Sequence, residues 1–193
     1  SSRVDLWVLE RTLRFLAEHR DRLPGQRFAI NLAPSTVCRV QFPLEVSRLL
    51  NKYAVEAWQL IFEVTECSTF GSAEQAMHTL RQLQKMGVRI AIDDFGTGYA
   101  SYARLKSVDA DILKIDGDFI RNIVNNSLDY QIVASICHLA RMKKMLVVAE
   151  YVETEEIRSA VPALGFDYVQ GYLIGRPAPL ESLLETEASC AEA

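Results

Sequence analysis

Residue types that would indicate particular chemistries are scarce in this chain of 193 residues. Only three histidines are present, and all fall in segments with helical periodicity: His19, His78 and His138. Four cysteines are present without CxxC or other close spacing: Cys38, Cys67, Cys137 and Cys190. The histidine pattern argues against a zinc site and a histidine base. The cysteine pattern argues against a zinc site and a disulfide framework, and it is typical of reduced thiols in a cytosolic chain.

Long apolar runs and a strong charge imbalance are also missing. No apolar run approaches the roughly 20 residues of a membrane span, and no signal peptide is visible. A net charge of -4 at pH 7 argues against a polymeric nucleic acid as partner, so an anionic ligand needs local help from metal ions, lysines or backbone amides. We expect a cytoplasmic domain, although a membrane-anchored parent protein would leave no trace in these residues.

The sequence alternates between two kinds of segment. Short β-branched runs typical of buried parallel strands occupy residues 27–32, 59–64, 88–93, 110–115, 145–149 and 166–170. Amphipathic segments with helical spacing occupy residues 4–19, 43–53, 71–86, 100–105, 130–143, 154–164 and 180–187. Repeated strand–helix units build parallel sheets, so we predict one α/β domain over residues 1–187, followed by a polar tail at 188–193.

Polar residues near the strand ends favour one of two architectures. They lie at or near the C-terminal ends of nearly all the predicted strands: Asn31, Glu63, Asp93, Asp94, Lys114, Glu150 and Gln170. A barrel draws its site from all its strand ends, whereas a doubly wound sheet gathers its ligands at one switch point. We therefore predict a TIM-type (β/α)₈ barrel of which about six βα units are present, the first two strands falling before residue 1.

The adjacent carboxylates Asp93 and Asp94 are the most informative of these residues. They stand where the apolar run at 88–92 meets a loop carrying Gly96 and Gly98. Taken alone, the pair is more typical of an Asx turn with a helix cap. Buried carboxylates, however, must be paired, protonated or bound to metal, and one lysine cannot neutralise four acids. We therefore predict one or two Mg²⁺ or Mn²⁺ ions in an all-oxygen site.

Six motifs follow one another along the chain: INL at 30–32, EVTE at 63–66, DDFGTGY at 93–99, LKID at 113–116, AEYVE at 149–153 and QGYLIGRP at 170–177. In order and spacing they resemble the EAL-domain family, bacterial phosphodiesterases that open cyclic di-GMP. The resemblance implies a modified (β/α)₈ barrel with one antiparallel strand, a two-metal site at its C-terminal rim, and hydrolysis to linear pGpG in second-messenger signalling. It also implies a homodimer fused to an upstream GGDEF or sensory domain.

The resemblance implies roles for individual residues as well. The implied metal ligands are Asn31, Glu63, Asp93, Asp94 and Glu150, with Asp94 on the second metal. The expected catalytic residues are Asp93, Lys114 and Glu150, and Lys114 would hold or help to activate the attacking water. The expected substrate contacts are Asp94, Tyr151 and Gln170. Two further acids, Glu66 and Glu153, would stabilise the neighbouring loop and the surroundings of the metals.

Several positions depart from the family's pattern. The glutamate–alanine–leucine signature is absent, since its strand would fall before residue 1. Ala33 and Tyr102 stand where serine and leucine are usual. Tyr151 stands where glycine is commonest, and its ring would either narrow the pocket beside Glu150 or stack on a guanine base.

Two other functions stay open, and each has its own discriminating feature. The first is a non-catalytic cyclic di-GMP receptor, which a replaced glutamate in the signature strand would favour. The second is a metal-dependent lyase of the enolase type, which would act on a small carboxylate. Because six strands cannot close an eight-stranded barrel, we also expect this chain alone to be inactive, with a gap between the strands at 27–32 and 166–170.

Overall fold

One sheet organises the described part of the chain, which comprises residues 1–65, 73–96 and 109–184 of the computed structural model. Its strands are β1 (Phe28–Asn31), β2 (Leu60–Thr65), β3 (Arg89–Phe95), β4 (Ile112–Ile115), β5 (Leu146–Ala149) and β6 (Tyr168–Val169). They lie side by side in chain order, and every neighbouring pair is parallel. This is the order of a barrel, because a doubly wound sheet reverses its order at a switch point.

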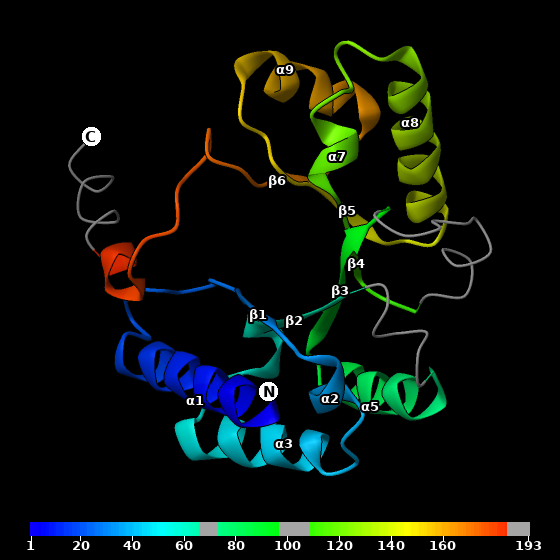
Figure 1. Cartoon of the computed structure of the whole chain (residues 1–193). Coiled ribbons are helices and arrows are strands. Elements are labelled where there is room, and N and C mark those ends of the chain that lie inside the picture. The colour runs from blue at the N-terminus through cyan, green and yellow to red at the C-terminus, as the bar shows by residue number, and fades with distance from the viewer. Residues whose placement is uncertain (66–72, 97–108, 185–193) are drawn as a thin grey trace.

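Helices cover the outside of the curved sheet (Figure 1). They are α1 (Ser2–Glu18), α2 (Pro34–Val37), α3 (Phe42–Tyr53), α5 (Ala73–Lys85), α7 (Gly117–Ile120), α8 (Ser127–Met142) and α9 (Glu155–Leu164), with short 3₁₀ turns η1 (Ala57–Gln59) and η2 (Leu180–Ser182). Among the described residues, none of these helices combines the length and apolarity that crossing a membrane requires. The predicted α/β fold, a TIM-type barrel of which six strands are present, is confirmed.

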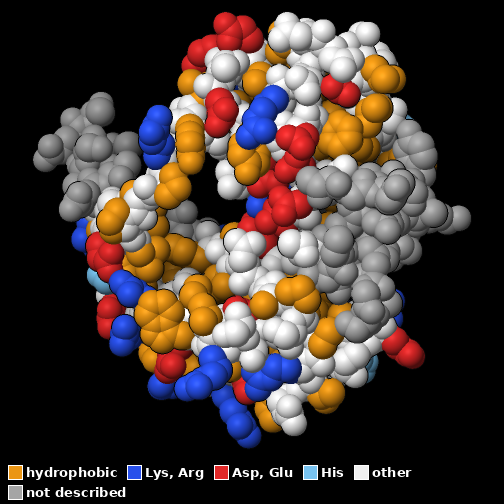
Figure 2. Space-filling model, in the orientation of Figure 1, with side chains coloured by type: hydrophobic (Ala, Val, Ile, Leu, Met, Phe, Trp, Pro, Cys, Tyr) orange, Lys and Arg blue, Asp and Glu red, His pale blue; other side chains and the backbone are white. Residues whose placement is uncertain are grey.

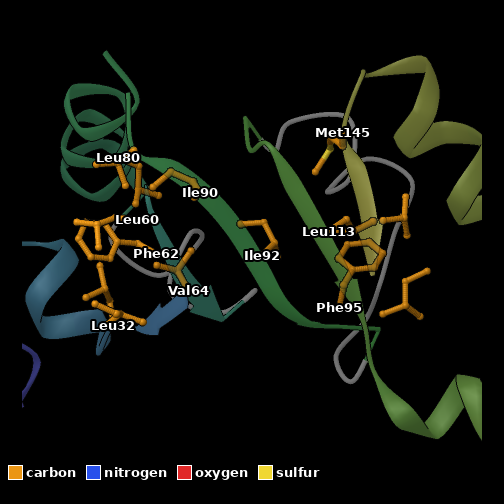
Figure 3. Close-up of a cluster of buried hydrophobic side chains, with 14 of the residues drawn as sticks. Leu32, Leu60, Phe62, Val64, Leu80, Ile90, Ile92, Phe95, Leu113 and Met145 are labelled. Atoms are coloured by element: carbon orange, nitrogen blue, oxygen red, sulfur yellow. The ribbon is translucent and has the colours of Figure 1, made fainter. Parts of the chain in front are cut away.

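The two faces of the sheet have different roles because successive strand residues point to opposite sides. On the outer face Leu60, Phe62, Ile90 and Ile92 are fully or almost fully buried, and Figure 3 shows Leu60 and Ile90 beside Leu80 of α5. On the inner face alternate residues of β2 to β6 and the residue directly after β6, together with residues 25–27 before β1, line a hollow of about 330 Å³. They are Gly25, Gln26, Arg27, Ile61, Glu63, Arg89, Ala91, Ile112, Lys114, Val148, Tyr168 and Gln170. The outer face therefore supplies the core, and the inner face supplies the site.

Some predicted elements differ from the observed ones. The last strand has two residues instead of five, although backbone bonds to β5 continue on both sides of it, from Asp167 to Val147 and from Gln170 to Ala149. The segment predicted as a final helix contains the turn η2, and its end lies outside the described residues, as do the polar tail and the helix predicted at 100–105. The short helices α2 and α7 were not predicted, since four residues are too few to show a helical period.

Candidate active site

Lys114 lies at the centre of the site and is surrounded by carboxylates from three neighbouring strands. It projects from β4 into the hollow and is 4% exposed. Its Nζ lies 3.1 Å from Glu63 Oε2, 2.8 Å from Asp93 Oδ1 and 3.0 Å from Glu150 Oε1. In Figure 2 a group of acidic side chains lies along one side of the central hollow. The carboxyl ends of β2, β3 and β5 thus bring together acids that are far apart in the sequence.

The carboxylates of this cluster outnumber its one ammonium, and the pKa values of Glu150, Glu63 and Lys114 are all raised. Burial raises the pKa of Glu150 to about 7. Burial also raises the pKa of Glu63, and the nearby charges of Asp93 and Asp94 add to that effect against the opposing influence of Lys114. Burial acts to lower the pKa of Lys114, but the surrounding carboxylates outweigh it and raise that pKa. One ammonium therefore does not satisfy the negative charge gathered here.

An irregularity in β3 brings Asp93 and Asp94 into the same site. Ile92 pairs with Leu113 and Phe95 pairs with Ile115, so β3 has one more residue than β4 over this stretch. This β-bulge places Asp94 in the left-handed region, with φ of 53°, a conformation that Asp tolerates better than most residues. In a regular strand the two side chains would point to opposite faces. Here Asp93, Asp94 and Glu150 offer carboxylate oxygens that all lie within 4.8 Å of one another.

The donor set fits a hard divalent cation. It consists of carboxylate oxygens, which Mg²⁺ and Mn²⁺ prefer. Glu150 Oε2 is buried and has no hydrogen-bond partner in the described part of the chain, and a buried charged oxygen without a partner is costly. Burial and the charges of Asp93 and then Asp116 raise the pKa of Asp94. A cation bound here would relieve all of these charges together.

Of the remaining predicted residues, some line the inner face or the pockets next to the acidic centre, and others lie outside the described residues. Asn31 ends β1, and its Cα is in register with Glu63, so it lies on the inner face, where it is exposed. Gln170 lines the hollow with Glu63 and Lys114. It also lines a second pocket of about 230 Å³ with Glu150, Tyr151, Glu153, Gly171 and Tyr172. Glu66 and Tyr102 lie outside the described residues.

Tyr151 follows Glu150 directly and has φ of 53°. This left-handed conformation accounts for a preference for glycine at the position. The ring is 45% exposed and packs toward α7, with the Arg121 guanidinium 4.4 Å from the ring centre. Gly117 makes room for it, since a Cβ there would lie 2.3 Å from Tyr151 Cδ2. The ring thus has a fixed place beside the pocket, held by contacts on its α7 side.

Asp116 was not among the predicted site residues. It is buried, and its Oδ1 accepts a hydrogen bond from the Asp118 backbone N–H at 2.8 Å, which caps α7. Its charge helps to raise the pKa of Asp94. The LKID motif contains this aspartate, but its closeness to Asp94 depends on how the end of β3 meets the end of β4.

Fold and site together define a class of protein, namely a parallel α/β half-barrel with an acidic centre at the carboxyl ends of its strands. The EAL domain family matches residues 1–177, and the chain belongs to that family. The cyclic di-GMP phosphodiesterase PdeF of Escherichia coli (strain K12) is 69% identical over 188 residues, which cover 97% of this chain and 25% of PdeF. The probable cyclic di-GMP phosphodiesterase PdeA of the same organism is 49% identical over 180 residues, covering 93% of this chain and 25% of that protein.

Solved structures agree with this assignment. A structure described as the PaMucR phosphodiesterase in complex with c-di-GMP has a TM-score of 0.85 at 37% identity, covering 94% of this chain and 74% of that one. The EAL domain of Mycobacterium smegmatis DcpA has a TM-score of 0.88 at 29% identity, covering 97% and 85%. The family predicted from the motifs is confirmed. The chain spans about a quarter of the length of the curated relatives named above, at 25% of each.

Proposed function

We propose that this EAL domain hydrolyses cyclic di-GMP to linear pGpG with Mg²⁺ or Mn²⁺ as cofactor. The acidic centre carries this proposal: Lys114 Nζ contacts Glu63, Asp93 and Glu150 at 2.8 to 3.1 Å, and Asp94 adds a further carboxylate. Relatives named as cyclic di-GMP phosphodiesterases, PdeF among them, support the choice of substrate. In the reaction, water adds to phosphorus, one P–O bond to a ribose breaks, and the ring opens.

Four acids and one amide would act as metal ligands. We assign this role to Glu63, Asp93, Asp94 and Glu150, together with Asn31. Two bound ions would lower the pKa of a water and neutralise the phosphodiester. The protein's own contribution is to hold the acids at a fixed separation in a buried site, where their charges remain strong.

Lys114 and the pocket residues would position the reactants. Lys114 donates hydrogen bonds to Glu63 and Asp93, which would leave its third N–H for a water between the acids and the substrate. Gln170 offers amide donors and acceptors where the hollow meets the second pocket. The exposed ring of Tyr151 lines that pocket and would contact a guanine. Glu66 and Glu153 would stabilise the surroundings.

The decisive experiment measures pGpG release by the full-length protein. We expect hydrolysis with Mg²⁺ or Mn²⁺, none in excess EDTA, and none from Asp93→Asn or Glu63→Gln, because each variant removes ligand charge from the site. Glu155→Gln is the matched control, since Glu155 is exposed on α9 and pairs only with Arg158 in the described part of the chain. Undiminished turnover in EDTA would refute the metal mechanism. Binding without turnover would favour the receptor function instead.

We propose that this domain acts in the cytoplasm and as a homodimer. Its barrel would comprise residues 1–187 and its tail residues 188–193, within a longer protein that carries GGDEF or sensory domains. The presence of further domains is supported by the relatives, since this chain covers only 25% of the length of PdeF and of PdeA. Light scattering on the full-length protein tests the dimer, and a monomer at micromolar concentration would contradict it.

A further inference from the structure

One buried carboxylate outside the acidic centre is tied to it through the backbone. Asp5 of α1 is 7% exposed. Its Oδ2 accepts hydrogen bonds from the Ala33 backbone N–H at 2.8 Å and from Thr36 Oγ1 at 2.5 Å, and Thr36 is fully buried. Asp5 therefore fastens the first helix to the turn between β1 and α2. Two donors on one charged oxygen make a strong attachment.

This turn begins directly after Asn31. The next residue, Leu32, donates its backbone N–H to the Glu63 carbonyl at 2.8 Å, which holds one side of the strand end. Ala33 is the N-cap of α2, and its side chain cannot accept a hydrogen bond there. Asp5 instead accepts the N–H of the N-cap residue itself and the hydroxyl of Thr36 in the first turn, and so holds the start of α2 from another helix. The backbone that carries Asn31 is thus held by β2 on one side and by α1 on the other.

Asn31 itself has little that would fix it through packing. Its side chain is exposed, and in the described part of the chain β1 pairs with β2 alone. A metal ligand has to be held within about 0.5 Å of its productive position. We propose that Asp5 is a positioning residue, which fixes the turn after β1 and thereby places Asn31 at the metal centre. This inference rests on the proposed function, because Asn31 is a ligand only if the centre binds metal.

The test measures Mn²⁺ binding by calorimetry in the full-length protein, without substrate. Asp5→Ala should weaken Mn²⁺ affinity about tenfold, the lower end of the range for residues that orient a ligand. Asp5→Asn should keep most of the affinity, because its Oδ1 can accept both hydrogen bonds. The matched control is Asp111→Ala. Asp111 Oδ2 accepts the Ile90 N–H at 2.8 Å, near the opposite ends of the strands, so its loss should lower the melting temperature and leave Mn²⁺ affinity unchanged.

A double-mutant cycle with Asn31→Ala separates positioning from a general loss of stability. If Asp5 acts through Asn31, the double variant should bind Mn²⁺ no more weakly than Asn31→Ala alone. Additive losses, or wild-type affinity in Asp5→Ala, would overturn the inference while leaving the metal centre intact. Failure of the wild-type protein to bind Mn²⁺ would instead refute the proposed function. Should Asp5→Ala not fold, Thr36→Val removes one of the two donors, and an unchanged affinity there would count against the inference.

Discussion

Lys114 carries the positive charge that keeps three carboxylates together, and its removal should expose their mutual repulsion. Breaking a buried ion pair by removing one partner costs about 3–5 kcal/mol. We therefore expect Lys114→Met to lower the free energy of unfolding by about that amount in EDTA, as measured by urea denaturation. Mn²⁺ should restore more stability to this variant than to the wild-type protein, because the ion supplies the missing charge.

A control for this variant is Lys52→Met. Lys52 lies 2.7 Å from Glu10 on the surface, where water screens the pair, so its loss should be far smaller. Equal losses for the two lysines would contradict the view that burial makes the Lys114 contacts important.

Glu150 should make metal binding depend on pH. Burial raises the pKa of this carboxyl to about 7, so at pH 6 it mostly carries a proton that must leave before a metal binds. Mn²⁺ affinity should therefore rise from pH 6 to pH 8, most steeply below pH 7 and by no more than about tenfold per unit. Calorimetry across this range checks it. Glu150→Gln should bind more weakly, with a flatter profile, and an equally steep profile in that variant would assign the effect to another group.

At the scale of single elements, the segment after β6 depends on a close approach that only glycine allows. A Cβ on Gly171 would lie 2.3 Å from the Val152 carbonyl oxygen. The two backbone segments cannot move apart easily, because hydrogen bonds join them on both sides of Gly171. The Val152 N–H donates to the Gln170 carbonyl at 3.0 Å, and the Leu173 N–H donates to the Val152 carbonyl at 3.2 Å. Gly171→Ala should therefore cost about 1–3 kcal/mol of stability, as overpacking generally does, and should displace Gln170 from the pocket.

Gly175 gives the matched control for that substitution. It lies in the same segment, and a Cβ there would meet no atom within 4 Å. Gly175→Ala should change the free energy of unfolding by less than about 0.5 kcal/mol. Thermal or urea unfolding of both variants decides the matter, and similar losses would mean that the contact with Val152 carries no strain.

The elements also show how far the sequence could predict the site. The strand order and the meeting of Glu63, Lys114 and Glu150 could be predicted, because the carboxyl ends of parallel strands converge in a barrel. The bulge at Asp93 and Asp94 could not, since it is defined by the pairing of β3 with β4, and local sequence does not reveal a shift in register. The resemblance of the motifs implied that both aspartates belong to one site, and the structure shows that the bulge brings their oxygens close to those of Glu150.

At the scale of the whole molecule, the sheet has two open edges in the described part of the chain. Within the described residues β1 pairs only with β2 and β6 only with β5, so the expected gap lies between them. The chain after β6 passes across the open side of the half-barrel (Figure 1). It reaches the first helix and the loop after it, where Arg11 lies 3.5 Å from Glu181 and the Arg22 guanidinium donates to the Leu184 carbonyl. As far as residue 184, where the described part ends, this segment bridges the opening without adding a paired strand.

Open strand edges and an exposed inner face should make the 193 residues, studied alone, associate with one another. We expect light scattering to show a mass that rises with concentration, and an activity assay to show no pGpG release.

The edge at β1 can be tested by introducing a charge. Ala29 is exposed on β1 and is in register with Ile61 of the hollow, so a lysine there should oppose edge pairing. Ala29→Lys should shift the mass toward the monomer, whereas Ala163→Lys, on the exposed side of α9, should not. A monomer at all concentrations, or equal shifts from both lysines, would show that association does not occur through the edge at β1.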